Sequence, residues 1–400
     1  MKLPVKSILA LMVFIAPWVN AEDHQQQQVE ELRAEIAQLK QLIINKNMVQ
    51  PQPKKEVPTL GLSKSGANVQ LYGFIRGDVA YQFEGAKGMF NSIHSVALEG
   101  DANKNATEDR LDSTLTTTRI GLDFKTPAQD ADIGGKIEMD FRGGADKDTV
   151  RLRHVYMTYN NWLIGQTTSS FLSTETAPEM LDFNTALGGG TTRTPMLRYN
   201  KKINSNTQYF IGIEKGHDDN RLPMATIKLS HKFADGDGLV TARSLLQEVR
   251  LRDINDATEL GWGAALGLRY KLTPSLQLST NYSHVSGDNK ILLASSTNQR
   301  YIQQGSGINL IDFDAFQIGA TYHLNEKFRS SVGFGTLVYD DEDPITKNAN
   351  KKLQQGWVNM MYKPYKALTF GAEYVYGERN TVNGLEGEDS RIGMMAKYDF

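Results

Sequence analysis

The sequence predicts an all-β protein, an up-and-down antiparallel transmembrane β-barrel of about 16 strands with a short N-terminal coiled-coil helix. Three observations support this prediction. Apolar residues alternate with polar or small ones along most of the chain, the connections between the alternating segments are short and long in turn, and the chain ends on an amphipathic strand. A membrane barrel needs these features because its outer face meets lipid and its inner face meets water.

The last ten residues, 391–400, show the alternation most clearly. Every second residue there is apolar, which is the period of a strand with one apolar and one polar face. Termini of soluble domains tend to fray, so a chain that ends on an aromatic strand residue indicates a barrel closed by its last strand. An amphipathic edge strand of a soluble sandwich is the alternative. The apolar residues are Ile392, Met394, Ala396, Tyr398 and Phe400.

The composition agrees with a barrel and excludes several other classes of protein. The mean hydropathy is −0.42 and 40% of the 400 residues are hydrophobic, as expected when only alternate residues face lipid. A formal net charge of −2 gives no indication of a nucleic-acid partner. The chain has no cysteine, so disulfides, thiol catalysis and cysteine-ligated metals are excluded.

The N-terminus has the pattern of a cleavable secretory signal peptide over residues 1–21. Two lysines precede an apolar run over 8–16, and Val19 and Ala21 supply small residues at the −3 and −1 positions of a cleavage site. A retained transmembrane helix needs about 20 apolar residues, and no stretch of the chain reaches this length. The pattern therefore predicts export and excludes a helical membrane protein.

Residues 22–48 are expected to form a periplasmic coiled-coil helix. Apolar residues recur at alternating spacings of three and four, which is a heptad seam. The seam is short, so we expect the helix to form only where neighbouring copies are held close together. A solvated amphipathic helix and a disordered spacer are the alternatives. The seam residues are Val29, Leu32, Ile36, Leu39 and Ile43.

A linker over 49–68 leads into the barrel, which is expected to span 69–400. Pro51, Pro53 and Pro58 make the linker extended and semi-rigid. After it, the two-residue period defines sixteen candidate strands, an even number, as a single-chain bacterial barrel requires. The candidate strands are 70–83, 114–125, 132–143, 149–160, 162–169, 195–202, 206–215, 222–234, 237–251, 258–272, 274–287, 311–324, 326–340, 353–363, 366–378 and 389–400.

The connections between these strands alternate in length. The short ones carry Asn, Gly or Pro, which are typical of tight turns, and the long ones are polar. A barrel has this asymmetry, with short periplasmic turns and long external loops, whereas a soluble sandwich has no reason for it. The short connections lie at 160–161, 234–238, 273–274, 325–326 and 364–365, and the long ones at 84–113, 170–194, 288–310, 340–352 and 379–389.

A row of aromatic residues supports the same orientation. Each strand that runs toward a short turn ends in an aromatic residue, and a membrane interface collects such residues at one level. Packing in a soluble core would scatter them instead. The residues are Phe124, Tyr159, Tyr199, Phe233, Tyr270, Tyr322, Tyr362 and Tyr398.

The lumen of such a barrel needs a segment that narrows it, because the side chains of the wall cannot fill the lumen of a sixteen-stranded barrel. The candidate is the loop 170–194, whose apolar residues are unusual for an exposed loop and indicate that it folds inward against the wall. An external lid over the mouth is the alternative. We expect the acidic residues of this loop, Glu175, Glu179 and Asp182, to oppose basic residues across the narrowest part.

Seven arginines are the candidate basic residues of this constriction. Arg151 and Arg153 share their parity with lipid-facing residues, so we expect a β-bulge that turns both toward water. A lipid-facing arginine would cost about 2–4 kcal/mol at the midplane. Arginines inside the lumen favour anions and can hold a carboxylate bidentately, although solvated residues without special affinity are the alternative. The other five arginines, placed by strand parity or position, are Arg76, Arg119, Arg142, Arg193 and Arg198.

No pattern of catalytic or metal-binding residues is found in the sequence. The seven histidines are scattered without metal-ligand spacing, and neither a Gly-x-Ser-x-Gly elbow nor a glycine-rich phosphate-binding loop occurs. We therefore expect a protein that is not an enzyme and that uses no cofactor or metal.

Several short motifs add a resemblance to these observations. They are Leu71-Tyr72-Gly73-Phe74, Gly165-Gln166-Thr167, Pro178-Glu179, Leu181-Asp182-Phe183-Asn184 and Tyr398-Asp399-Phe400. With the leader, the coiled helix and the linker, they make the whole mature chain resemble DcaP-type porins of the bacterial outer membrane. The resemblance implies homotrimers, a periplasmic helix and uptake of small anions such as dicarboxylates. Similar trimeric porins would place Arg119, Arg151 and Arg193 near the eyelet and Glu179 on the loop opposite.

We therefore expect an outer-membrane porin that lets small hydrophilic solutes diffuse passively, with a preference for anions. Its expected partners are two further copies in a homotrimer, outer-membrane lipid and lipopolysaccharide, and small anionic solutes, but no nucleic acid. The alternatives are a barrel that tethers the envelope or serves as a surface receptor, and an outer-membrane barrel enzyme.

Overall fold

The computed structural model describes residues 66–400 except 103, 253–254, 289, 296–299, 306 and 341–348, and, near the N-terminus, residues 30, 33–35, 37–38 and 40. The chain divides into two compact units, Met1–Pro58 and Thr59–Phe400. The described residues of the first unit are helical and exposed. The expected signal peptide, the five seam residues of the expected coiled coil and most of the expected linker lie outside the described residues.

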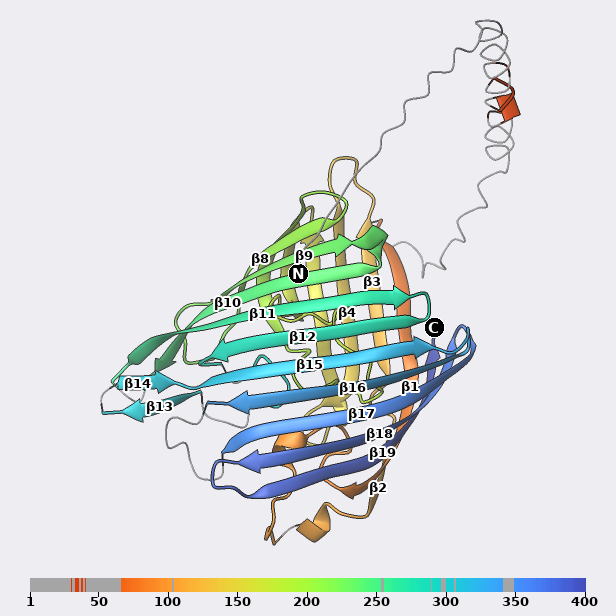
Figure 1. Ribbon diagram of the computed structural model, residues 1–400. Coiled ribbons are helices and arrows are strands. Elements are labelled where there is room, and N and C mark those ends of the chain that lie inside the picture. The colour runs from red at the N-terminus through yellow and green to blue at the C-terminus, as the bar shows by residue number, and fades with distance from the viewer. Residues whose placement is uncertain are drawn as a thin grey trace, which may run out of the picture. The chain divides into compact units, whose positions relative to one another are not determined.

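The second unit is a closed antiparallel barrel (Figure 1). Each strand pairs with its neighbours around the wall, and β1 (Asn68–Glu84) pairs with β19 (Glu386–Asp399) to close the cylinder. β2 (Arg110–Thr114) and β3 (Arg119–Thr126) both pair with β1, so the 17 strands of the sheet occupy 16 positions around the wall. The predicted fold class and strand number are therefore confirmed.

The other strands of the wall lie close to the predicted ranges. Around the barrel they are β4 (Ile133–Gly143), β5 (Thr149–Tyr159), β6 (Trp162–Thr168), β7 (Arg193–Lys202), β8 (Thr207–Glu214), β9 (Met224–Phe233), β10 (Gly238–Leu251), β11 (Ala257–Thr273), β12 (Leu276–Ser286), β15 (Asp312–His323), β16 (Phe328–Tyr339), β17 (Asn350–Tyr365) and β18 (Leu368–Thr381). Three short 3-10 helices lie in the connections: η1 (Ile93–Ser95), η2 (Lys104–Ala106) and η3 (Ala234–Gly236). Within the described part of the chain, no helix combines the length and the apolar character needed to cross a membrane.

The terminal residue takes part in closing the barrel. The backbone N–H of Phe400 donates to the carbonyl oxygen of Gly73 at 3.1 Å, and the N–H of Gly73 donates to the Phe400 oxygen at 3.2 Å. A Cβ atom at position 73 would lie 2.9 Å from the Phe400 ring. The glycine therefore leaves space for the ring at the seam.

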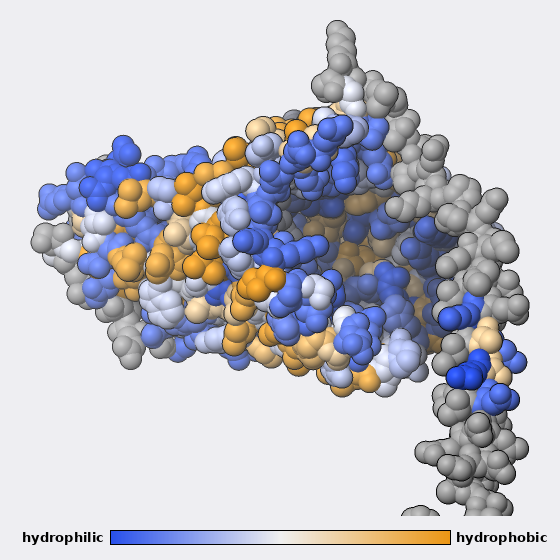
Figure 2. Space-filling view, turned by 90° about the horizontal axis from the view of Figure 1, so that it is seen from above, coloured by the Kyte–Doolittle hydropathy of each residue, from blue (hydrophilic) through white to orange (hydrophobic). Residues whose placement is uncertain are grey.

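The outer face of the wall is apolar and the inner face is polar. In β11, the outward residues Leu260, Trp262 and Leu266 are exposed, while the inward residues at 261, 263 and 265 are buried. In the space-filling view, a hollow surrounded mainly by hydrophilic residues lies between walls that carry hydrophobic residues (Figure 2). This is the alternation that a wall between lipid and water requires.

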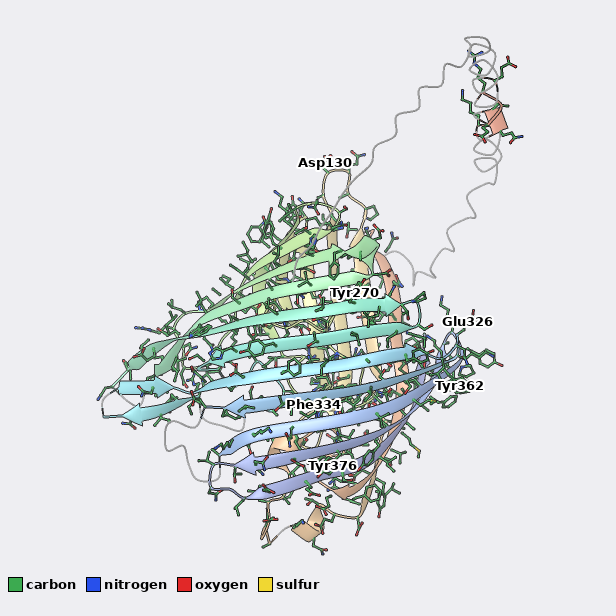
Figure 3. The ribbon with its side chains drawn as sticks, in the orientation of Figure 1. Asp130, Tyr270, Glu326, Phe334, Tyr362 and Tyr376 are labelled. Atoms are coloured by element: carbon green, nitrogen blue, oxygen red, sulfur yellow. The ribbon has the colours of Figure 1, made fainter. Side chains whose placement is uncertain are left out.

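The predicted aromatic row lies at the short-turn end of the strands. Tyr270 and Tyr362 lie there, near Glu326 of a short turn, while Phe334 and Tyr376 lie further along the strands (Figure 3). Rings stack at this end. Phe233 of β9 stacks on Tyr270 of β11 across Gly238 of β10, with centroids 5.6 Å apart, and Phe328 of β16 stacks on Tyr362 of the adjacent β17, with centroids 4.5 Å apart.

Three connections differ from the prediction. The expected strand 114–125 is interrupted, and β2 and β3 are separated by residues 115–118. The expected long loop 379–389 is a four-residue turn at 382–385, because β18 and β19 continue as a polar hairpin beyond their apolar stretches. The expected loop 288–310 contains a separate hairpin of β13 (Tyr301–Gln304) and β14 (Gly307–Leu310).

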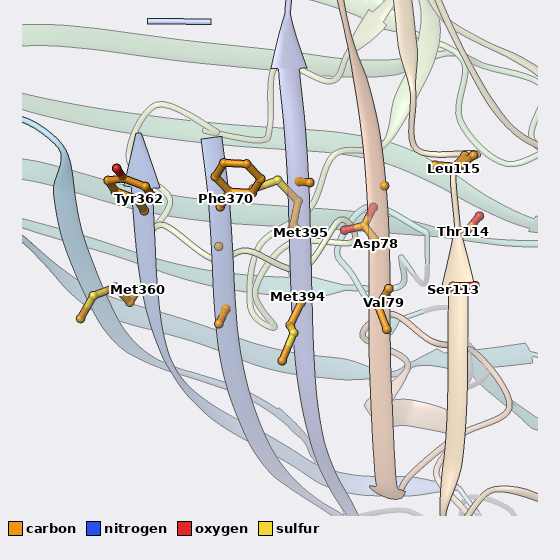
Figure 4. A pocket seen from close by; sticks show the side chains of 14 residues that line it. Asp78, Val79, Ser113, Thr114, Leu115, Met360, Tyr362, Phe370, Met394 and Met395 are labelled. Atoms are coloured by element: carbon orange, nitrogen blue, oxygen red, sulfur yellow. The ribbon is translucent and has the colours of Figure 1, made fainter. Parts of the chain in front are cut away.

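The interruption between β2 and β3 borders an apolar groove of about 990 Å³ on the wall. Figure 4 shows its lining side chains, which come from β1, β2, β17, β18 and β19 and from Leu115 in the interruption. Small residues, Gly77, Ala372 and Ala396, lie among larger ones such as Met394 and Phe370. Several of these larger residues are outward-facing and exposed, so the groove opens on the apolar side of the wall.

Candidate functional site

The loop after β6 (residues 169–192) packs against the inner side of the wall. Phe171 and Leu187 are completely buried, and a Cβ atom at Gly263 of β11 would lie 3.0 Å from the Phe171 ring. The indole N–H of Trp357 in β17 donates to the backbone oxygen of Glu179 at 2.9 Å. These contacts come from strands far apart in the sequence, which means that the loop crosses the barrel interior.

Glycines allow the loop backbone to lie directly on the strands. Gly188 has φ +83°, and a Cβ atom there would lie 2.5 Å from the carbonyl oxygen of Phe316 in β15. A Cβ atom at Gly335 of β16 would lie 2.2 Å from the oxygen of Leu187. Side chains at these two positions would push the loop away from the wall.

Each acidic residue of the loop forms an ion pair with a cation of the wall. Glu175 pairs with Lys228 at 2.8 Å, and Glu179 with Arg329 at 2.9 Å. Asp182 pairs with Arg391 at 3.0 Å. Each of these carboxylates thus has the nearby cation that a buried acid needs. That the three acids oppose the arginine cluster across the pore stays a prediction.

The environment of Glu175 shows the effect of its cation. Burial acts to raise the pKa of its carboxyl group, but the neighbouring ammonium of Lys228 outweighs burial and holds the pKa below its ordinary value. The carboxylate therefore remains ionised at neutral pH and fixes its end of the loop.

A buried acid of the wall holds the middle of the loop. The carboxylate of Glu373 in β18 accepts the backbone N–H of Leu181 at 2.7 Å and that of Asp182 at 3.0 Å. It also accepts an N–H of the Asn359 amide at 3.0 Å. Three donors thus satisfy a carboxylate that is 4% exposed.

Two further loops fill the same end of the barrel. In loop 85–109, Phe90 packs on Phe183 with ring centroids 5.8 Å apart, and Ile93 is completely buried. In loop 287–311, the N–H of Leu293 donates to the oxygen of Gly189 at 2.8 Å. The hydrophobic core therefore lies at the long-loop end, where these two loops and the loop 169–192 meet the wall.

A β-bulge turns both arginines of β5 toward the interior. Opposite β4, His154 pairs with Glu138 and Leu152 pairs with Met139, so Arg153 is the extra residue of the bulge. Arg151 binds Asp140 through two hydrogen bonds of 2.8 and 2.6 Å. Arg153 reaches both Glu138 and Asp140 at 2.8 Å. The bulge expected from the parity conflict is present.

Arginines from several strands gather around the ring of Phe183, at the tip of the loop. The guanidinium carbon of Arg76 lies 5.5 Å from the ring centroid, that of Arg142 5.8 Å and that of Arg153 5.9 Å. Arg76 also donates to the backbone oxygen of Leu181 at 2.8 Å. Cation–π contacts of this kind hold the guanidinium groups while leaving donors free for another ligand.

The cluster contains more positive than negative charge. Arg119 lies 3.4 Å from Glu138, and the charge of Arg193 interacts with those of Arg151, Arg153 and Asp140. Six arginines therefore meet three carboxylates, which leaves three positive charges uncompensated within the cluster. The arginines are Arg76, Arg119, Arg142, Arg151, Arg153 and Arg193, and the carboxylates belong to Asp78, Glu138 and Asp140.

Two arginines of this cluster form no ion pair with any acid that the structure describes. Arg142 stacks on Phe90 at 4.6 Å and reaches only the Thr116 hydroxyl at 3.5 Å, and Arg193 makes no ion pair with any residue that the structure describes. Arg198, the seventh candidate, belongs to a different group. Its guanidinium carbon lies 5.4 Å from the centroid of the Phe210 ring, and the ammonium of Lys228 lies 5.5 Å from the same centroid.

The sequence analysis did not predict the three carboxylates of the cluster, nor that Glu373 binds the backbone of the loop. Strand parity could have indicated the carboxylates, because Glu138 and Asp140 share the parity of Arg142 on one strand and Asp78 shares that of Arg76. Among the described residues, no group of three or more His, Asp or Glu side chains has the arrangement needed to hold a metal ion.

The fold and the loop-narrowed lumen together define a porin-type barrel of the outer membrane. The chain is similar to the crystal structure of the outer membrane channel DcaP of Acinetobacter baumannii, with 41% identity, a TM-score of 0.80 and coverage of 85% of this chain and 99% of that one. A family model described as the DcaP outer membrane protein matches residues 21–400. The chain belongs to the DcaP outer membrane protein family.

More distant structures share the fold alone. An anion-selective porin from Comamonas acidovorans has 12% identity and a TM-score of 0.57, with coverage of 84% of this chain and 100% of that chain. OmpT of Vibrio cholerae in a trimer form has 14% identity and a TM-score of 0.53, with coverage of 84% and 99%. A comparison of the sequence with curated proteins gives no match.

Proposed function

We propose that this protein is an outer-membrane porin through which small hydrophilic solutes diffuse passively, with a preference for anions such as dicarboxylates. The observation that carries the proposal is the excess of three positive charges in the arginine cluster beside the loop 169–192. Fixed cations at the narrowest part of a water-filled path attract anions and repel cations.

The two arginines that form no ion pair among the described residues suit a solute that carries carboxylates. A guanidinium group can bind a carboxylate through two parallel hydrogen bonds. Arg142 and Arg193 have donors available for such binding, whereas Arg151 and Arg153 already bind acids of the wall. A solute with two carboxylates could replace part of its hydration at two arginines in turn and leave again, because each site is weak.

The similar proteins support the same proposal. The structure with 41% identity is described as an outer membrane channel, and the distant Comamonas structure is described as an anion-selective porin. We therefore propose transport and no enzymatic activity. We also propose a homotrimer, which agrees with the trimer form described for OmpT. Contacts with lipid and lipopolysaccharide would lie on the apolar outer face.

The organisation outside the barrel also remains a proposal. Residues 1–21 would be removed as a signal peptide, 22–48 would form a periplasmic coiled helix, and 49–68 would be a linker to the barrel. The sequence patterns described above support each of these assignments.

Replacing Arg119 and Arg193 together by glutamine tests the anion preference. A unit charge about 10 Å from a solute in water contributes about 0.4 kcal/mol, so the anion-to-cation permeability ratio should fall at least twofold for each charge removed. The measurement is the reversal potential of the purified pore in a planar bilayer under a KCl gradient.

A matched control removes two exposed cations of the loops, through Lys147→Gln and Arg252→Gln. This variant should keep most of the anion preference. An unchanged permeability ratio in the Arg119 and Arg193 double variant would rule out the arginine cluster as the source of selectivity.

A further inference from the structure

A second cavity with basic walls lies at the long-loop end of the barrel, outside the arginine cluster. Its volume is about 270 Å³, and it is bounded by the start of β7, the loop 215–223, the end of β10 and the loop after β12. Such a volume accommodates a small organic solute.

The lining of this cavity carries an excess of positive charge. Four cations line it, Arg193, Lys215, Lys290 and Arg300, against two carboxylates, Asp218 and Asp288. Lys215 pairs with Asp218 at 2.8 Å on the exposed rim. Asp288 is occupied by its own turn, because its Oδ1 atom accepts the backbone N–H groups of Lys290 and Ile291 at 2.7 and 2.8 Å.

One of these cations is buried, which distinguishes the cavity from a surface with scattered lysines. The Arg300 side chain is 5% exposed and lies 3.4 Å from Asp219 and 3.3 Å from the backbone oxygen of Arg250. The Lys290 ammonium has no hydrogen-bond or ion-pair partner among the residues that the structure describes. Burial and the charges of Arg300 and Lys290 hold the pKa of His217 below its ordinary value, so this histidine is neutral at neutral pH.

Arg193 connects this cavity with the constriction. It lines the cavity, and its charge also interacts with those of Arg119, Arg151 and Arg153. An anion held in the cavity therefore has the Arg193 side chain between it and the other arginines of the cluster. Arg193 forms no ion pair with any acid that the structure describes.

We infer that this cavity is a docking site for small organic dianions, which collects them at the mouth and passes them through Arg193 to the constriction. The inference rests on the proposed function. It assigns Lys215, Lys290 and Arg300 to capture and the inner arginines to selection. Electrostatic attraction of this kind raises association rates, and salt weakens it.

Single-channel recording with succinate as the probe tests the site. Brief interruptions of the ion current report association and dissociation separately. In the Lys215→Gln/Lys290→Gln variant, succinate added on the loop side should associate about threefold more slowly than with the wild type at low salt. Its dissociation rate should be unchanged. Succinate added on the turn side should associate as in the wild type. A Gly384→Cys variant, labelled in the exposed turn 382–385, identifies the loop side.

The matched control is Lys87→Gln/Lys147→Gln, which removes the same charge from exposed positions of two other connections, 85–109 and 144–148. Its effect on the association rate should be smaller, and the difference between the two variants should disappear in about 1 M salt, where the Debye length is about 3 Å. Equal effects of the two variants, or no effect of either, would overturn the docking site.

The reversal potential of the wild-type pore separates this failure from a failure of the proposed function. If the wild type prefers anions and the two variants behave alike, only the docking site is wrong. If the wild type has no anion preference, the proposed function is wrong and the docking site with it.

Discussion

Arg329 of β16 holds Glu179 of the loop 169–192, with its Nε atom 2.9 Å from both carboxylate oxygens. The Ser331 hydroxyl donates to the same carboxylate at 3.1 Å, and Trp357 binds the backbone oxygen of Glu179. Three side chains from two adjacent strands thus fix one loop residue. The acid of the Pro178-Glu179 motif therefore fixes the position of the loop.

We expect the Arg329→Gln variant to loosen the loop. The Glu179 carboxylate would lose its charged partner, which costs about 1–3 kcal/mol of stability. Single-channel recordings should show larger current fluctuations than those of the wild type, and the thermal unfolding temperature should fall. The control is Lys327→Gln, which removes an exposed cation of the neighbouring turn. A quiet channel in the Arg329 variant would show that the other contacts are sufficient.

The wall could be predicted from the sequence because lipid constrains every second residue. The same constraint predicted the bulge in β5, since on a regular strand Arg151 and Arg153 would share the lipid face with Met157 and Tyr159. The polar hairpin of β18 and β19 around residues 379–389 escaped prediction for the opposite reason. Its residues continue beyond the apolar stretches, so no alternation marks them as strand.

The interior was harder to predict, because its contacts join residues far apart in the sequence. Parity placed the arginines, but it could not show that the loop acids pair with Lys228, Arg329 and Arg391. The sequence does indicate that loop 85–109 folds inward, since Phe90 and Ile93 are unusual in an exposed loop. Their partners, however, depend on the closed barrel.

The Gly188→Ala substitution should displace the loop. The new Cβ atom would lie 2.5 Å from the oxygen of Phe316, in addition to the strain of an alanine at φ +83°. We expect a change in single-channel conductance and a loss of about 1–3 kcal/mol in stability. Gly384→Ala is the matched control, because Gly384 has φ +80° and no atom within 4 Å of the added Cβ. If both variants changed conductance equally, backbone strain alone would explain the result.

The Asp140→Asn substitution should increase the anion preference and lower the stability. The buried carboxylate of Asp140 binds Arg151 and Arg153, so its neutralisation adds one uncompensated positive charge to the cluster. Losing one partner of a buried pair costs about 3–5 kcal/mol. Reversal potentials and unfolding in guanidinium measure the two effects. Asp148→Asn, at an exposed position, should change neither, and a lower anion preference in the Asp140 variant would contradict the assignment of the cluster.

Deleting Phe400 should weaken closure of the barrel at its seam. The deletion removes both backbone hydrogen bonds with Gly73, at 3.1 and 3.2 Å, and we expect a loss of about 1–3 kcal/mol. The measurement is the fraction of purified chain that refolds in liposomes into a form resistant to heat in detergent. Phe400→Ala keeps the two backbone bonds and should refold better than the deletion. Equal refolding of the two variants would assign the contribution of this residue to its ring, which lies against Gly73.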